Sequence, residues 1–576
     1  MITKTQLTRH RPWTGRLTAL TAAVAIACGS LADANPGKTR ASGRAAKQKA
    51  QVGAIQQIHR LLREDGKLDR TDRALLTLVG HLARSGIDIG GLLADEGSYL
   101  NWLLEGVRFG SIHSPVALRQ FARLVERLIA DGELDANDTF ILTLTSIRIE
   151  NDGGLTSQTS SLIDVLEKLA AAGLDLASYT EENPSLVSLL FELVGGIKPV
   201  TLPQELCELI DQLAADGSLD SNDLFTITLY VFTLENSDGA HNPGNASLVA
   251  VLRKLAAAGV DLAAYTEQHS SLISSLLELA NSVPPIPIPP EFCDLIDELA
   301  ADGTLDSNDL FTLTMFAATF GNSDGQSNAA SQSLVTVLRK LAAAGIDLAT
   351  YTESYPTLVA SLFHLVNDIP PIPIPQEFCD LIDELAADGS LDTNDLYILS
   401  LYAAMISGDQ GATAAHGSLV AVLRKLDSLG IDLPSLDPSL VGSLLEHVRS
   451  GQPIPPEFCD LVLALAFDDG LLNSSDLLAL SLAAEILEET GNLDQRAIVF
   501  AEMIRSLSDS GLDVTGLFAA PDSFLLALFE AVQGHELTLA EIEDIRFALE
   551  NFLIDHHLDE FERAVLEEMV AAAMAD

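Results

Sequence analysis

The chain has 576 residues, a formal net charge of -49 and 48% hydrophobic residues. This hydrophobic content is ample for a packed core, and a charged fraction of 20% is too low for a disordered chain. So large an excess of acid repels nucleic acid and anionic lipid, so we expect no nucleic-acid role and favour cations and basic proteins as partners.

Residues 1–34 have the layout of a secretory signal. Four basic residues come first, an apolar run from Leu17 to Cys28 follows, and small residues surround Ala34, after which we expect cleavage. The run has 12 residues, whereas a bilayer span needs about 20, so we expect no transmembrane segment. The alternative is a lipoprotein signal with Cys28 as the acylated, lipid-anchored residue. Either signal predicts a secreted or periplasmic protein.

Residues 35–51 contain five Lys or Arg residues and no acid, interspersed mainly with Gly, Ala and Ser, which predicts a flexible basic arm. Two signatures then repeat. The first, DGxLDxxD, has its Gly at 217, 303 and 389, two steps of 86 residues. The second is a Gly followed by Ile, Leu or Val and then Asp, as at Gly345 to Asp347. A fixed period of this length predicts a tandem-repeat architecture.

Each unit is predicted to hold four helices, as in the copy that begins at Glu291. The first ends at Gly303, which adopts the left-handed conformation at little cost. Asp306 caps the second, with Asp309 three residues later in an acidic variant of the capping box.

The third helix is expected from about Ser333 to Ala344, and the fourth from near Thr352 to the prolines that begin at Pro371. The second helix is ambiguous, because Phe225 to Thr233 alternates like a strand, whereas the equivalent Leu477 to Glu489 is rich in Ala, Leu and Glu. Homologous copies share a fold, so we predict helix in all of them.

The predicted fold is therefore all-α, an α-solenoid of four-helix repeats of about 86 residues with atypical terminal copies. In the first copy, Gly66 and Gly86 are only 20 residues apart, so a helix and its loop are missing. The predicted parts are a signal peptide (1–34), the basic arm (35–51), a shortened N-terminal repeat (52–114), repeats 2 to 6 (115–201, 202–287, 288–373, 374–454 and 455–534) and a C-terminal capping half-repeat (535–576).

The DGxLDxxD turn resembles the second half of a calcium-binding EF-hand loop over about eight residues. Calcium takes six to eight oxygens, but all six copies place an apolar or cationic residue at the third ligand position, such as Ala300. We therefore prefer a helix N-cap role for these acids and expect only weak binding of divalent cations. The candidate metal ligands are Asp216, Asp220, Asp223, Asp302, Asp306, Asp309, Asp388, Asp392 and Asp395. The segment Asp555 to Asp559 is a denser cluster, but its adjacent His556 and His557 point apart, and we assign no site there.

Four cysteines occupy one column of the first helix. Equivalent positions in successive units lie about 20 Å apart, whereas bridged Cα atoms lie within about 7 Å, so we expect buried free thiols. No nucleophile, P-loop, metalloprotease or dinucleotide motif stands in a supporting context, so we expect no enzyme and no cofactor. The cysteines are Cys207, Cys293, Cys379 and Cys459.

The sequence thus predicts an exported acidic helical-repeat protein, a binding or spacing scaffold for protein partners, with a calcium-responsive or calcium-buffering protein as the alternative. Basic pairs such as Arg253 and Lys254 are expected to interact with the helix dipole and neighbouring acids. The tyrosines of the Tyr-Thr-Glu segments are expected to be apolar anchors. The loops 235–247, 321–332 and 407–418 are predicted to be flexible with little core duty, which leaves the repeated acidic helical face for the partner.

Overall fold

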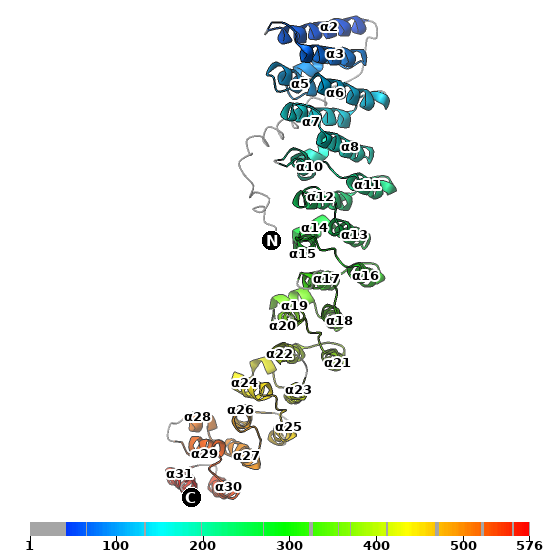
Figure 1. Ribbon diagram of the computed structural model, residues 1–576. Coiled ribbons are helices and arrows are strands. Elements are labelled where there is room, and N and C mark those ends of the chain that lie inside the picture. The colour runs from blue at the N-terminus through cyan, green and yellow to red at the C-terminus, as the bar shows by residue number, and fades with distance from the viewer. Residues whose placement is uncertain are drawn as a thin grey trace. The chain divides into compact units, whose positions relative to one another are not determined.

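The computed structural model describes residues 42–64, 66–131, 134–196, 198–268, 270–321, 326–354, 356–368, 370–409, 413–466, 472–519, 523–555 and 558–574. Every regular element in these ranges is a helix (Figure 1). The all-α prediction is confirmed, including the segment that alternates like a strand, because Phe225 to Thr233 lies inside the helix Ser221–Asn236. The chain divides into two compact units, which are described separately: residues 1–305 with 324–326, and 306–323 with 327–576.

The first unit contains fifteen α-helices among its described residues. They are α2 (Ser42–Leu62), α3 (Arg70–Arg84), α4 (Ile89–Ala94), α5 (Tyr99–Arg108), α6 (Pro115–Leu128), α7 (Ala136–Asp152), α8 (Ser157–Ala171), α9 (Leu176–Glu182), α10 (Ser185–Gly195), α11 (Gln204–Leu213), α12 (Ser221–Asn236), α13 (Pro243–Ala257), α14 (Leu262–Gln268), α15 (Ser270–Ala280) and α16 (Pro290–Leu299).

The second unit contains a further fifteen among its described residues. They are α17 (Ser307–Phe320), α18 (Ala329–Ala343), α19 (Leu348–Ser354), α20 (Pro356–Val366), α21 (Gln376–Leu385), α22 (Thr393–Asp409), α23 (Ala414–Ser428), α24 (Pro438–Arg449), α25 (Pro456–Leu465), α26 (Ser474–Thr490), α27 (Gln495–Asp509), α28 (Val514–Ala519), α29 (Phe524–Gln533), α30 (Leu539–Phe552) and α31 (Glu560–Ala573). Short 3₁₀ turns, such as Ala386–Asp388, extend several first helices.

The prediction of four helices per copy is wrong, because a short helix stands between the third and fourth positions. In the first unit this element is α9 or α14, and in the second it is α19. Asp175, the N-cap of α9, accepts a hydrogen bond from the Ser178 N–H. The helix predicted from Thr352 is in fact the end of α19 followed by α20, which starts at Pro356, whose ring cannot continue a preceding helix.

The third helices begin earlier than predicted and take up much of the predicted loops. Helix α18 starts at Ala329, because Asn328 caps it in a reciprocal pair with Ser331. Asn245, Ser331 and His416, all from the predicted loops, are 0%, 1% and 0% exposed. Asn245 also donates a hydrogen bond from Nδ2 to Thr233 Oγ1 in α12. The expectation that these loops have little core duty is therefore wrong at their C-terminal ends.

In the N-terminal part of the first unit, α3 alone lies between Gly66 and Gly86. In the third copy, by comparison, both α12 and α13 lie between Gly217 and Gly259. Helix α2 begins at Ser42, so residues 42–51 of the predicted arm are helical in this structure.

The second helices α12 and α22 each pack between elements of two copies within their unit. Helix α12 contacts α10 of the preceding copy as well as α11 and α13 of its own, and α22 contacts α20, α21 and α23 in the same way. Leucines such as Leu190 in α10, Leu252 in α13 and Leu399 in α22 are completely buried. Each such side chain contributes roughly 1.5–3 kcal/mol, so these repeated leucine contacts stabilise the packing of the helices.

Candidate functional site

The acidic turns cap helices. Asp220 Oδ1 accepts a hydrogen bond from the Asp223 N–H at 2.8 Å, and Asp223 Oδ2 accepts one from the Asp220 N–H at 3.1 Å. Asp306 and Asp309 form the same reciprocal pair, at 2.9 and 3.0 Å. The predicted N-cap geometry is thus present, and each carboxylate already accepts hydrogen bonds from backbone N–H groups that a helix start leaves without an intrahelical partner.

The turn of the fifth copy has the same geometry. Asp392 Oδ1 accepts hydrogen bonds from the Asn394 and Asp395 N–H groups at 2.8 and 3.0 Å, and Asp395 Oδ2 accepts one from the Asp392 N–H at 3.0 Å. Asp388 accepts only a longer hydrogen bond from the Ser390 N–H at 3.2 Å, and Asp216 a similar one from the Ser218 N–H at 3.4 Å. The Asp302 side chain lies outside the described residues.

Burial opposes charge at two of these acids. It raises the pKa of Asp223 and of Asp395, even though a backbone hydrogen bond to each carboxylate acts in the opposite direction. In the part of the chain that the structure describes, no three His, Cys, Asp or Glu side chains are grouped so that they could hold a metal ion. His556 and His557 lie outside that part. The arrangement of the described acids therefore fits helix capping.

An asparagine two residues after the capping Asp ties each copy together, and sequence reasoning missed it. Asn222 donates from Nδ2 to the Val260 carbonyl at 3.0 Å and accepts from the Leu262 N–H at 2.8 Å. The amide thus holds the junction between α13 and α14. The same pair of bonds is made by Asn137 to Leu174 and Leu176, Asn308 to Ile346 and Leu348, and Asn394 to Ile431 and Leu433. The signal was available, since four of the signatures read DGxLDxND.

A serine in the third helix links each copy to the segment that starts the next one. Its hydroxyl oxygen accepts a hydrogen bond from a backbone N–H that lies 41 residues further along the chain in three pairs and 36 residues further in the fourth. The pairs are Ser161 with Leu202 at 2.9 Å, and Ser247 with Ile288, Ser333 with Ile374 and Ser418 with Ile454 at 2.8 Å each. The bond gives the irregular, proline-rich linker a fixed point on the helix.

Lys254 and Lys340 of the basic pairs interact with neighbouring acids as predicted, as does Lys168 at the equivalent position, and the acids of these lysines lie on the first helix of the following copy. Arg424 instead contacts Glu384 on the first helix of its own copy. In the first unit, Lys168 of α8 contacts Asp211 of α11 at 2.6 Å, and Lys254 of α13 pairs with Asp297 of α16. In the second unit, Lys340 of α18 contacts Asp383 of α21 at 2.5 Å. The hydrogen bond that each lysine donates to its aspartate is the main cause that raises the pKa of that lysine.

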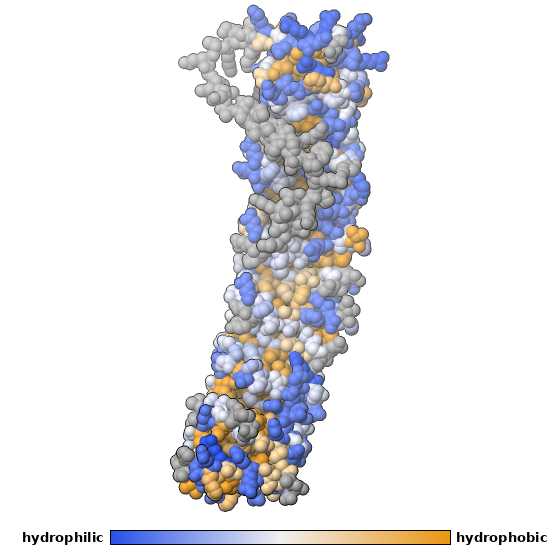
Figure 2. Space-filling view, turned by 90° about the vertical axis from the view of Figure 1, so that its left-hand side faces the viewer, coloured by the Kyte–Doolittle hydropathy of each residue, from blue (hydrophilic) through white to orange (hydrophobic). Residues whose placement is uncertain are grey.

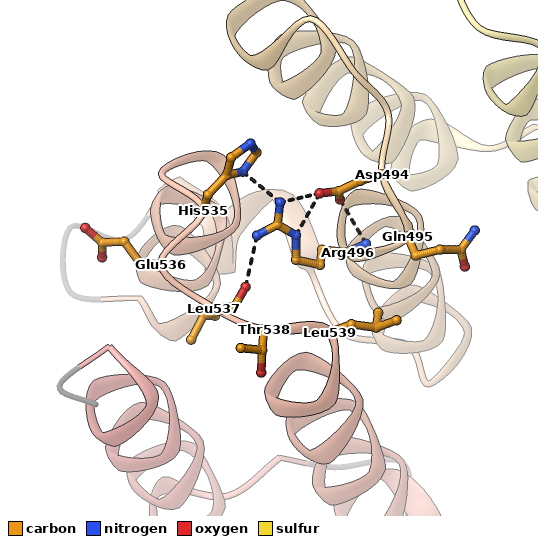
Figure 3. A pocket seen from close by; sticks show the side chains of 8 residues that line it. All are labelled: Asp494, Gln495, Arg496, His535, Glu536, Leu537, Thr538 and Leu539. Carbon is orange, nitrogen blue, oxygen red and sulfur yellow. Dashed lines mark hydrogen bonds and ion pairs between the residues drawn. The ribbon is translucent and has the colours of Figure 1, made fainter.

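A hollow of roughly 380 Å³ lies between the start of α27 and the segment that leads into α30 (Figure 3). Arg496 occupies it. Its Nη1 donates to the Leu537 carbonyl at 3.1 Å, its Nη2 contacts His535 Nδ1 at 2.9 Å, and Nε and Nη2 both donate to Asp494. Burial raises the pKa of Asp494, but Arg496 and backbone donors outweigh this and lower it overall.

These bonds use the guanidinium in the joint itself. In this copy Val499 occupies the position of the serine. Arg496 instead forms the hydrogen bond to the segment before α30, which is the segment that the serine contacts in the earlier copies. The hollow is thus part of a structural joint and offers no uncommitted cation to a ligand.

The cysteine column holds free thiols. Cys207 and Cys379 are buried, Cys293 and Cys459 are half-buried, and burial is the main cause that raises the pKa of all four thiols. A raised pKa disfavours the reactive thiolate. These cysteines are therefore packing residues, and Cys28 lies outside the described part of the chain.

The tyrosines of the Tyr-Thr-Glu segments also connect copies. Tyr351 of α19 is 7% exposed, and its hydroxyl lies 3.3 Å from Ser400 Oγ in α22. Tyr179 of α9 hydrogen-bonds Thr228 of α12, while burial raises its pKa. This agrees with the predicted anchoring role and extends it with a polar contact.

The contacts between helices made by the asparagines, serines, lysines, Arg496 and tyrosines are here called joints. Acids that take no part in these joints lie on the outer face of the first helices. In the first unit, Glu208 of α11 and Asp294 of α16 are exposed and form no ion pair within the described residues. In the second unit, Asp380 of α21 and Asp460 of α25 occupy the equivalent position, directly after the cysteine. These four carboxylates are here called the outer acids.

Comparison of the chain with protein-family models, with curated proteins and with solved structures found no match in any of the three. Among the described helices, none has both the length and the apolar composition needed to cross a membrane.

Proposed function

We propose that the protein is an exported α-solenoid that binds a cationic protein partner through its outer acids and acts as a binding or spacing scaffold. The observation that carries the proposal is the recurrence of the same joints. The clasping asparagines at 222, 308 and 394 follow one another at intervals of 86 residues. Joints that repeat at a fixed interval support a modular array, in which each copy is held by its neighbours and the outer positions can serve binding.

The chemistry of the outer acids supports a protein partner with Lys or Arg on its surface. Their neighbours Asp211 and Asp297 are already paired with lysines, whereas the charges of Glu208 and Asp294 are not compensated by an ion pair within the described residues. The calcium-responsive alternative has less support, because the turn carboxylates already accept hydrogen bonds from backbone N–H groups.

The test compares two pairs of substitutions in the first unit. Glu208→Gln with Asp294→Asn removes two outer acids, and Glu181→Gln with Glu278→Gln removes two exposed acids from other helices. A partner is captured from the producing cell's envelope, purified and titrated against all three proteins at low and high salt. We expect the first pair to weaken binding and flatten its salt dependence, and the control pair to leave both unchanged. Equal behaviour of the two variants would reject the outer acids as the binding surface.

A further inference from the structure

Positive charge is concentrated near one end of the chain. Residues 35–131 contain 15 Lys or Arg and 10 Asp or Glu, whereas residues 132–576 contain 14 and 71. Most cations of the long acidic part are held by carboxylates, as Lys168 is by Asp211. Lys49, Arg60 and Arg63 of the first unit, by contrast, form no ion pair within the described residues. Their charge is available to a partner.

These cations share the outer face of α2. Lys49, Val52, Gln56, Arg60 and Arg63 recur at intervals of three or four residues, which places them on one side of the helix. The opposite side packs on α3 and α4 with Ala54, Ile58 and Leu62, which are 7%, 0% and 6% exposed. Val52 is 54% exposed among the cations. No described helix of the first unit covers this basic face.

The C-terminal helices of the second unit expose apolar side chains. Phe547 of α30 is 68% exposed, Ile554 just after it is 77% exposed, and Phe561 of α31 is 72% exposed. Figure 2 shows hydrophobic residues gathered at the end of the molecule where these helices lie. Phe561 stands two residues after the capping Asp559, which is the position of the clasping asparagine in earlier copies. Apolar groups thus occupy a place where the earlier copies are held by a polar contact.

Acids surround these apolar groups. Glu560, Glu567 and Glu568 are exposed on α31, and burying aromatic side chains beside them is favourable only against a surface that also supplies cations. The basic face of α2 supplies both features, with Arg60 and Arg63 for the acids and Val52 for the apolar groups.

We propose that a second copy of this chain is the partner, with the basic face of α2 in one molecule docked on the α30–α31 end of another. Two molecules with a net charge of -49 repel each other as wholes, so association is favoured only where a positive end meets an acidic one. The two surfaces differ, so the contact is head-to-tail, and such contacts form open chains when the rotation does not close a ring. The proposal does not depend on the cationic partner of the outer acids.

The test blocks each end separately in the full chain and measures mass by sedimentation velocity across a wide range of concentration. Arg60→Glu with Arg63→Glu blocks the basic face, and Phe547→Arg with Phe561→Arg blocks the C-terminal end. Wild type should form chains that lengthen with concentration. Each blocked protein alone should associate at least about tenfold more weakly, whereas their mixture should form one-to-one dimers that do not grow, because each supplies one intact end.

Arg119→Glu with Arg123→Glu on α6 is the matched control, since it makes the same charge change at exposed positions outside the basic face. It should associate as wild type does, and all variants should retain wild-type helicity by circular dichroism. A dimer that persists when the basic face is blocked but not when the C-terminal end is blocked would show an end-to-end symmetric contact and overturn the proposal. Monomers throughout, or binding of the basic face to vesicles of anionic phospholipid without self-association, would also overturn it.

Discussion

Replacing the clasping asparagine Asn222, which bonds the junction between α13 and α14, with Ala tests whether this side chain holds the helices of its own copy together. The substitution leaves the Leu262 N–H and the Val260 carbonyl without their partner, and both residues are at least nine-tenths buried. An unpaired buried group costs roughly 1–3 kcal/mol, and partial access of water through the half-exposed Asn222 site reduces the cost, so we expect about 2 kcal/mol for the pair. That corresponds to a roughly thirtyfold increase in the equilibrium constant for local opening of this segment.

The assay is amide hydrogen exchange in the segment that contains Leu262, together with the urea midpoint of unfolding. Asn222→Ala should speed exchange there roughly thirtyfold and lower the midpoint. Asn222→Asp keeps the acceptor but loses the donor, so it should protect the Leu262 N–H while still lowering the midpoint. Asn236→Ala, which removes only an exposed hydrogen bond within α12, is the control and should change neither. Unchanged exchange at Leu262 in Asn222→Ala would refute the clasp.

Four further outcomes are expected. Gly195→Ala would place a Cβ 1.9 Å from Arg148 Nη1, and Arg148 is buried and bonded to Asp152, so we expect the free energy of unfolding to fall by roughly 1–3 kcal/mol. In the control Gly417→Ala the new Cβ has nothing within 4 Å, so the melting temperature should stay unchanged or rise. Burial raises the pKa of Glu167, Glu192 and Glu485, so their contribution is fully present below the ordinary value of 4.5 and is lost as pH rises through the higher folded-state pKa. Hydrogen bonds lower the pKa of Asp347 and Glu541, whose contribution is lost as pH falls through the depressed pKa. The melting temperature should therefore rise as pH falls from neutrality through the raised pKa values of the three glutamates, and fall again in more acidic solution as the depressed pKa values are passed. Millimolar calcium should raise the melting temperature slightly and without fixed stoichiometry, and saturable micromolar binding of one ion per turn in calorimetry would contradict the capping role. Thiol titration of the denatured, unreduced protein with residues 1–34 removed should find four free sulfhydryls, and two or none would show pairing.

Much of the fold follows from local patterns in the sequence. The left-handed Gly217 and the capping Asp220 determine where α11 ends and α12 begins without help from distant residues, so both were predictable. The helix over Phe225 to Thr233 required a comparison between copies, because its β-branched residues favour a strand when that copy is considered alone. Helix α19 was missed because a seven-residue helix between a capping Asp and Pro356 contains too few turns for its periodicity to stand out.

The joints were harder to predict, because their partners are remote in sequence. Asn222 is a polar residue in the first turn of a helix, where solvent contact is the usual expectation, and its partners lie 38 and 40 residues away. Ser247 likewise reaches Ile288, 41 residues away. The repetition of such residues at a fixed step is visible in the sequence, but the contact that explains it requires the three-dimensional arrangement.

The joints also indicate which positions are left for function. The residue after the cysteine column makes none of the contacts described above. It is Arg123 in the second copy, Phe547 in the C-terminal half-copy, and an acid in the four copies between them, namely Glu208, Asp294, Asp380 and Asp460. The asparagine, serine and lysine positions keep their chemistry across the middle copies, whereas this outer position changes from basic to acidic to aromatic. Because a substitution there does not disturb a buried hydrogen bond, its identity can follow the surface that each copy has to meet. The acidic copies in the middle then suit a cationic partner, while Phe547 at the C-terminal end suits the apolar contact that the head-to-tail association requires.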